Sequence, residues 1–292
     1  MRTFREAVQG EEFTVTAELT LKRASIADDV LRQADILGPF VDGIQVTDNP
    51  WSWVQMSAVS AASILFHHGV DPIPILTCRD RNRIALQSDL IGLRALGVTS
   101  VLLMRGHRVP KKHVTPASTV FDTTGRELIA MASDLNEDET LGPGKDFFIG
   151  TGARAFRPER GWRAESLTER ANAGARFLQT QLCFNMDILR HYMKRLVEAK
   201  LTWHYSVLVS LCPLPSASTT KWLKENTRGL RIPKSVIQRM ENAKDPEHEG
   251  IEICAELMRE ISEVPGVSGV NLMTTGNADL IPAAIRASGL RS

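Results

Sequence analysis

The chain has 292 residues, of which 43% are hydrophobic and 24% charged, a balance typical of globular proteins with a large buried core. Its 35 basic and 34 acidic residues leave a formal net charge of +1, so no bulk charge draws it to nucleic acid or to an anionic membrane. No run approaches the roughly 18 apolar residues of a membrane span, and the charged N-terminal segment lacks the apolar stretch of a signal peptide. We therefore expect a cytoplasmic protein with no nucleic-acid or membrane partner.

Short apolar runs alternate with amphipathic stretches over the whole length, which is the pattern of strands and helices. Up to residue 104, the predicted elements are strand 13–19, helix 26–37, strand 41–47, helix 55–68, strand 73–77, helix 83–96 and strand 100–104. Four more strands, each followed by a helical pattern, are predicted at residues 147–150, 177–181, 206–211 and 267–273. The chain thus contains eight predicted strand–helix units.

These units predict the fold class. Strands separated by helices pair in parallel, because the crossover between them consumes a helix. Eight such units in 292 residues predict an α/β fold, a single (β/α)8 TIM barrel with residues 1–292 as one domain. An open doubly wound sheet is the alternative. It would be favoured by a Gly-rich turn after the first strand, but the residues there, ELTL at 18–21, form no such turn.

Two segments depart from the plain repeat. Residues 105–125 are rich in basic residues, proline and threonine, and are predicted as a long loop after the fourth strand. Residues 235–265 are predicted as extra helices before strand eight, broken where Pro246 follows Asp245.

Cysteine and histidine usage gives no sign of disulfides or of a metal site. The cysteines lie far apart in apolar runs, which is typical of reduced core residues; they are Cys78, Cys183, Cys212 and Cys254. The seven histidines form no metal-binding spacing, and no H-E-x-x-H motif occurs.

Polar residues gather at the predicted strand ends. In this barrel class the active site lies at the carboxyl ends of the strands. Polar groups occur there at residue 18 and at residues 47–49, 77–80, 105–107, 153–159, 180–181 and 274–277. Their concentration at strand ends rather than in the helices predicts a polar pocket.

Glu18 interrupts the apolar strand VTAEL. Partial desolvation of a carboxylate at this position raises its pKa and suits it to donate a proton near neutral pH. A structural ion pair with a neighbouring arginine is the alternative, and position alone leaves both open.

Other strand-end side chains also have two interpretations each. Arg105 follows SVLLM and could fork onto a ligand phosphate or carboxylate, or form a salt bridge within the barrel. Gln181 could bond the edge of a heterocycle such as a pterin, or be a satisfied core amide. Trp51 and Trp53 could stack on a flat ligand or pack a loop. The basic loop after Arg105 could hold the acidic tail of a ligand or be merely solvated; it carries Arg108, Lys111, Lys112 and His113.

At these strand ends the sequence resembles the methylenetetrahydrofolate reductase family. The similar segments follow the family's order and are AEL around Glu18, VTDN at 46–49, LTCRDRN at 76–82, LLMRGH at 102–107, L-x-x-R-x-x-AGA at 167–175 and TQLCFN at 180–185. LTCRDRN and AGA-x-x-x-x-TQ are fairly specific together, whereas each alone is a weak signal.

The resemblance implies a (β/α)8 fold and reduction of 5,10-methylenetetrahydrofolate to 5-methyltetrahydrofolate. In the family, NAD(P)H reduces a bound FAD, and the flavin passes hydride to the methylene carbon. The resemblance further implies that Glu18 is the acid that helps to open the folate ring, and that Gln181 binds the pterin, with Asp48 and His107 also at the substrate. The family's flavin-contacting positions correspond to Thr47, Arg105, Gly106, His107, Ala155 and Arg170.

The flavin positions depart from the family pattern. The usual RGD is Arg105-Gly106-His107, which exchanges an acidic group near flavin and pterin for a histidine. Arg170 replaces a usual lysine, and Asn277 stands where an arginine is usual. Three hypotheses follow: a reductase with bound FAD, which is favoured, a folate enzyme that takes hydride directly from NAD(P)H, and a catalytically silent homologue. The sequence does not choose between NADH and NADPH, and it is compatible with a homo-oligomer.

Overall fold

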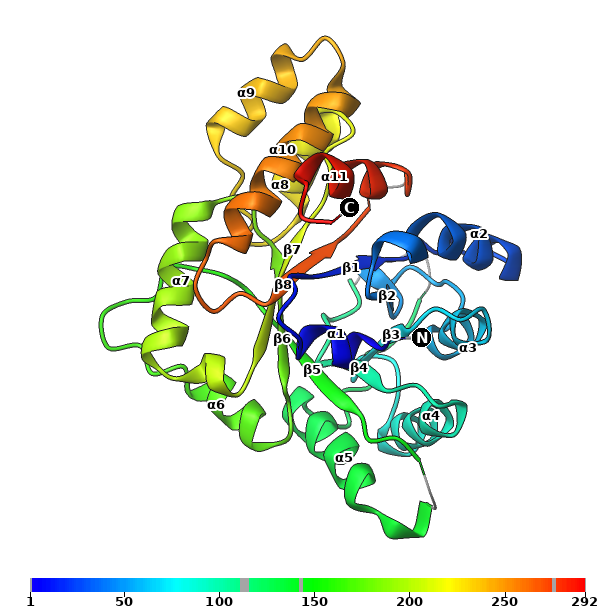
Figure 1. Ribbon diagram of the computed structural model, residues 1–292. Coiled ribbons are helices and arrows are strands. Elements are labelled where there is room, and N and C mark those ends of the chain that lie inside the picture. The colour runs from blue at the N-terminus through cyan, green and yellow to red at the C-terminus, as the bar shows by residue number, and fades with distance from the viewer. Residues whose placement is uncertain (1, 111–115, 142–143, 275–276, 292) are drawn as a thin grey trace.

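The computed structural model describes residues 2–110, 116–141, 144–274 and 277–291. Eight parallel strands pair in chain order and β8 pairs with β1, so the sheet is a closed barrel (Figure 1). The strands are β1 (Thr14–Glu18), β2 (Gly43–Val46), β3 (Pro72–Thr77), β4 (Ser100–Met104), β5 (Phe148–Ala153), β6 (Phe177–Leu182), β7 (Ser206–Leu211) and β8 (Gly269–Leu272). The predicted (β/α)8 barrel is confirmed, and the open sheet is excluded.

Helices surround the barrel (Figure 1). They are α1 (Phe4–Val8), α2 (Ala27–Leu37), α3 (Ala58–His67), α4 (Arg83–Leu96), α5 (Gly125–Glu137), α6 (Glu165–Asn172), α7 (Met186–Glu198), α8 (Ala217–Asn226), α9 (Lys234–Asn242), α10 (Pro246–Ser262) and α11 (Leu280–Ser288). In the described parts of the chain, no helix is both long and apolar enough to cross a membrane. The predicted extra helices before strand eight are α9 and α10. Asp245 caps α10, and Pro246 occupies its first turn, where a proline costs no hydrogen bond.

The short helix α1 closes the amino-terminal end of the barrel, and the sequence patterns did not predict it. Thr3 begins α1 with a capping box, in which its side chain and that of Glu6 each bond the other's backbone. Phe4 packs against Phe148 and Phe177, with ring centroids 5.9 and 5.1 Å away. Its backbone N–H donates to the buried Asp71 carboxylate at 2.7 Å. An aromatic plug, formed by Phe4, Phe148 and Phe177, therefore fills the amino-terminal end of the barrel.

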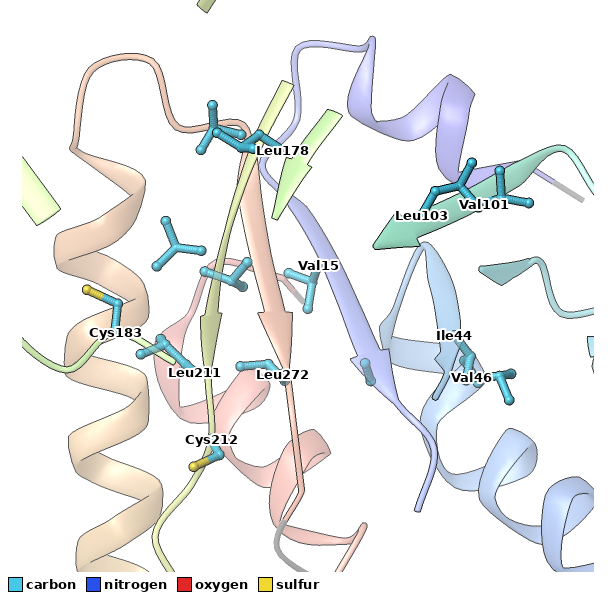
Figure 2. Packing of buried hydrophobic residues seen from close by; sticks show 14 of the residues in the cluster. Val15, Ile44, Val46, Val101, Leu103, Leu178, Cys183, Leu211, Cys212 and Leu272 are labelled. Atoms are coloured by element: carbon cyan, nitrogen blue, oxygen red, sulfur yellow. The ribbon is translucent and has the colours of Figure 1, made fainter. Parts of the chain in front are cut away.

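Each strand alternates between an outer and an inner face. The outer residues pack against the helices in one large cluster; Figure 2 shows some of them, including Val15, Ile44 and Leu103. The inner residues near the floor form a second cluster with α1, which includes Leu102 and Leu208. All four cysteines are free and buried, as predicted. Because side chains alternate along a strand, the two clusters identify which polar residues face the barrel interior.

Candidate active site

Glu18 faces the barrel interior at the carboxyl end of β1. Its neighbours Ala17 and Leu19 belong to the outer cluster, so Glu18 lies on the opposite face. Thr16, two residues earlier on that face, donates to the Asn271 Oδ1 of β8 at 2.9 Å. The side chain of Glu18 therefore lies at the mouth of the barrel.

The Glu18 carboxylate forms no ion pair with the part of the chain that the structure describes. Among the described residues, none gives it a salt bridge or a side-chain hydrogen bond, so the structural alternative of a partner arginine does not hold. Burial alone raises the pKa of Glu18 to about 7. Burial also raises the pKa of the thiol of Cys212, which follows β7, to about 12, and the negative charge of Glu18 adds to this rise. A carboxyl group with a pKa near neutrality can give up a proton at physiological pH.

A layer of buried polar side chains lies below Glu18 inside the barrel. Gln45 is the register partner of Glu18 on β2, and its amide exchanges two hydrogen bonds with Gln179 of β6. Because β2 and β6 lie opposite each other, this pair spans the interior. Ser210 and Asn271 are register partners on β7 and β8, and the Ser210 Oγ and Asn271 Nδ2 have no partner among the described residues.

Sequence reasoning did not single out this layer. Its signal is a polar residue in the middle of a buried strand, as in GIQV, FLQT, VLVS and GVNL. Such residues can be placed on the inner face only when the barrel closes and fixes the register.

Gln181 lies at the same end of the barrel, near the carboxyl end of β6, and is exposed. The register of β6 with β7 shifts between Gln179 and Leu182. Gln181 lines a recess that it shares with Ala155, which follows β5. Of the predicted site residues, the structure thus places Glu18 and Gln181 at the barrel mouth and Ala155 beside Gln181.

The side chains at the carboxyl end of β2 form hydrogen bonds and an ion pair within the protein. Asp48 accepts hydrogen bonds from the Thr77 backbone N–H at 2.8 Å and hydroxyl at 2.7 Å, and it forms an ion pair with Arg81. Burial raises the pKa of Asp48, while Arg81 and Thr77 oppose the rise. Gln55 donates to the Thr47 carbonyl oxygen at 2.7 Å and to its Oγ1 at 3.0 Å. The Asp48 side chain is only 4% exposed, so a ligand contact there would have to displace these bonds.

The residues after β4 point in different directions. The Arg105 guanidinium lies 4.2 Å from the centre of the Phe121 ring, on the same side of the strand as the outer residue Leu103. Gly106 has φ +79°, and a Cβ there would lie 3.1 Å from the Cβ atoms of Thr77 and Arg79, so a larger residue would be strained. His107 is exposed. Lys111, Lys112 and His113 lie outside the described residues.

Arg170 and the tryptophans complete the predicted set. From α6, Arg170 Nη1 donates to the Gly152 carbonyl oxygen at 2.7 Å and to the Thr151 hydroxyl at 3.0 Å, which ties the helix to β5.

Trp51 and Trp53 are each 57% exposed, so neither is buried in a loop core. No group of three or more His, Cys, Asp or Glu able to hold a metal ion occurs in the described parts of the chain.

Comparison with known proteins identifies the family. The family model of methylenetetrahydrofolate reductase matches residues 3–289. The chain belongs to the methylenetetrahydrofolate reductase family. This confirms the resemblance noted at the strand ends.

Individual relatives are distant. A probable methylenetetrahydrofolate reductase (NADPH) from Caenorhabditis elegans is 24% identical over 245 residues, which cover 81% of this chain but only 35% of that protein. The chain thus spans about a third of its curated relative. Among solved structures, an uncharacterized protein from Clostridium thermocellum that binds two copies of 5-methyl-5,6,7,8-tetrahydrofolic acid is 13% identical, with a TM-score of 0.62 over 98% of this chain and 97% of that one. An F420-dependent secondary alcohol dehydrogenase is 12% identical, with a TM-score of 0.59 over 96% and 100%. At such identities the two structures support the barrel fold.

Proposed function

We propose that this protein reduces 5,10-methylenetetrahydrofolate to 5-methyltetrahydrofolate with electrons from NAD(P)H. The observation that carries the proposal is Glu18, a desolvated carboxyl group at the mouth of a barrel whose chain matches the reductase family. Gln181 lies at the same end of the barrel and offers both a donor and an acceptor to a pterin edge. The folate bound by the Clostridium thermocellum protein supports the substrate class.

Glu18 supplies the proton in this proposal. Its carboxyl group protonates the departing nitrogen of the five-membered folate ring, the bond from that nitrogen to the methylene carbon breaks, and a methylene iminium forms. A hydride then adds to the iminium carbon and gives the methyl group, while NAD(P)H becomes NAD(P)⁺. A pKa of about 7 keeps a large fraction of Glu18 protonated at neutral pH, which an ordinary glutamate could not do.

The resemblance also predicts bound FAD, but the described residues do not fit it as they stand. Thr47 is bonded to Gln55, Arg170 is bonded to β5, and Arg105 lies over Phe121. The hydrogen bonds of Thr47 and Arg170 within the protein occupy groups that a flavin would need, so we derive no step through one. These contacts favour a second candidate function, direct hydride transfer from NAD(P)H to the same folate. Bound FAD stays a prediction, and the visible absorbance spectrum of the purified protein tests it.

The experiment on the acid compares wild type with Glu18→Gln and Glu11→Gln under anaerobic conditions. We expect folate-dependent NAD(P)H oxidation in wild type and Glu11→Gln, with kcat/KM falling as the pH rises through about 7 and Glu18 loses its proton. The kcat/KM of Glu18→Gln should be at least a hundredfold below that of wild type, in line with general-acid catalysis. Turnover near the wild-type rate in Glu18→Gln would reject the assigned acid.

A further inference from the structure

The recess that contains Gln181 is also lined by two arginines. Arg154 reaches it from the loop after β5, and Arg231 reaches it from the segment between α8 and α9. The two segments touch, since a Cβ on Gly229 would lie 2.5 Å from the Arg154 Nη1. Gly229 has φ +80°, so the backbone conformation that allows this approach is one that suits glycine. Segments distant in sequence thus bring two arginines to one recess.

Neither arginine is paired with an acidic group in the described ranges of the chain. No ion pair or hydrogen bond joins Arg154 or Arg231 to another described residue, although the same part of the structure contains well-formed arginine pairs such as Arg239 with Glu256. Among the described residues that line the recess, none is acidic, and the polar ones besides the arginines are Gln181, Asn185 and Thr227, with the thiol of Cys183. The recess therefore presents donors and positive charge without a carboxylate of its own.

The surrounding sequence strengthens this charge. The loop at residues 153–164 has four arginines against one glutamate, and residues 227–234 have three basic residues and no acidic one. The whole chain has a net charge of only +1, so these two segments are more basic than the chain as a whole. A local field of this kind attracts and orients an anionic ligand even when the protein is nearly neutral.

We propose that Arg154 and Arg231 form an anion-binding subsite for the ligand whose ring Gln181 contacts. The inference rests on the proposed function, which supplies two ligands with anionic ends: the glutamyl carboxylates of a folate and the phosphates of a nicotinamide dinucleotide. Both are planar or tetrahedral oxyanions that an arginine fork can bind through two hydrogen bonds. The subsite holds the anionic end outside the barrel while the reacting ring lies at the mouth, near Gln181.

The test measures equilibrium binding, without turnover, to wild type, Arg154→Gln, Arg231→Gln and Arg160→Gln. Arg160 is the matched control, because it is an exposed arginine of the same loop that does not line the recess. The probes are 5-methyltetrahydrofolate with one and with three glutamates, NADH and NADPH. We expect each recess variant to weaken one of these ligand classes by about tenfold, the usual scale for one charge-assisted hydrogen bond. We also expect the salt dependence of wild-type binding to be reduced in those variants but not in Arg160→Gln.

The pattern of losses identifies the anion. A greater loss for the triglutamate than for the monoglutamate assigns the subsite to the folate tail. A loss for both dinucleotides assigns it to the diphosphate, and a loss for NADPH alone assigns it to the 2′-phosphate. Losses no larger than in Arg160→Gln, or no binding of any probe to wild type, would overturn the subsite. If the variants bind like wild type while wild type still forms methyltetrahydrofolate, only this inference fails, and the proposed function stands.

Discussion

Replacing Glu18 by glutamine should stabilise the fold in a pH-dependent way. Burial raises the Glu18 pKa from its ordinary 4.5 to about 7, so the folded state disfavours the ionised carboxylate. Below pH 4.5 both the folded and the unfolded chain keep the proton, and Glu18 costs nothing. Between pH 4.5 and 7 the unfolded chain loses its proton first, so the free energy of unfolding falls as the pH rises. Above pH 7 the full cost applies.

The magnitude follows from the two pKa values. With a tenfold change in proton affinity equal to 1.36 kcal/mol, the ionised Glu18 lowers the unfolding free energy by about 1 kcal/mol at pH 5 and about 3 kcal/mol at pH 8.5. Glutamine does not titrate. The unfolding free energy of Glu18→Gln relative to that of wild type should therefore rise by about 2 kcal/mol from pH 5 to pH 8.5. Urea unfolding at both pH values, followed by circular dichroism, measures the gain.

Glu11→Gln is the control, because Glu11 is exposed just before β1. Its stability relative to wild type should change by less than about 0.5 kcal/mol between the two pH values, as is usual for surface substitutions. The reasoning is refuted if the Glu18→Gln gain is the same at pH 5 and pH 8.5, because Glu18 would then ionise as an ordinary glutamate does.

Three further predictions concern the barrel. Gln45→Leu should lower the free energy of unfolding by about 1 to 3 kcal/mol because it leaves the Gln179 amide unpaired, and adding Gln179→Leu should recover part of that loss. A double-mutant cycle in urea measures both effects, and strictly additive losses would contradict the pairing. Phe4→Ala should cost about 3 to 5 kcal/mol by emptying the aromatic plug, and a loss below about 1 kcal/mol in the same assay would show that α1 is dispensable. Gly106→Ala should lower the melting temperature, because its φ is +79° and its Cβ would crowd Thr77; an unchanged melting temperature would argue against this loop geometry.

The barrel could be predicted from the sequence because its strands are continuous apolar runs, separated by amphipathic helices. The strands at 100–104 and 206–211 were placed to the residue, since each is bounded by loop residues. The helix α1 was missed because only five residues form it, too few for a helical period to appear. Its stability comes from packing against Phe148 and Phe177, which lie far away in the chain.

The candidate site was predictable only in part. Glu18 stood out because a carboxylate interrupts an apolar strand, and this local signal already implied a raised pKa. The hydrogen bonds and the ion pair of Asp48 could not be predicted, because Thr77 and Arg81 reach it only after β2 and β3 pair. Likewise, no local pattern distinguishes Arg154 and Arg231 from ordinary surface arginines. Their shared recess depends on the loop after β5 meeting the segment after α8.

The central claim is that this protein reduces the methylene carbon of the folate with electrons from a reduced nicotinamide. The most direct measurement incubates purified protein anaerobically with 5,10-methylenetetrahydrofolate and NADPH or NADH deuterated at the transferring position, and determines the mass of the methyltetrahydrofolate formed. The account predicts that wild type forms methyltetrahydrofolate and that Glu18→Gln forms almost none; deuterium in the methyl group would identify direct transfer from the nicotinamide. Absence of methyltetrahydrofolate from the wild-type reaction, with and without added FAD, would contradict it.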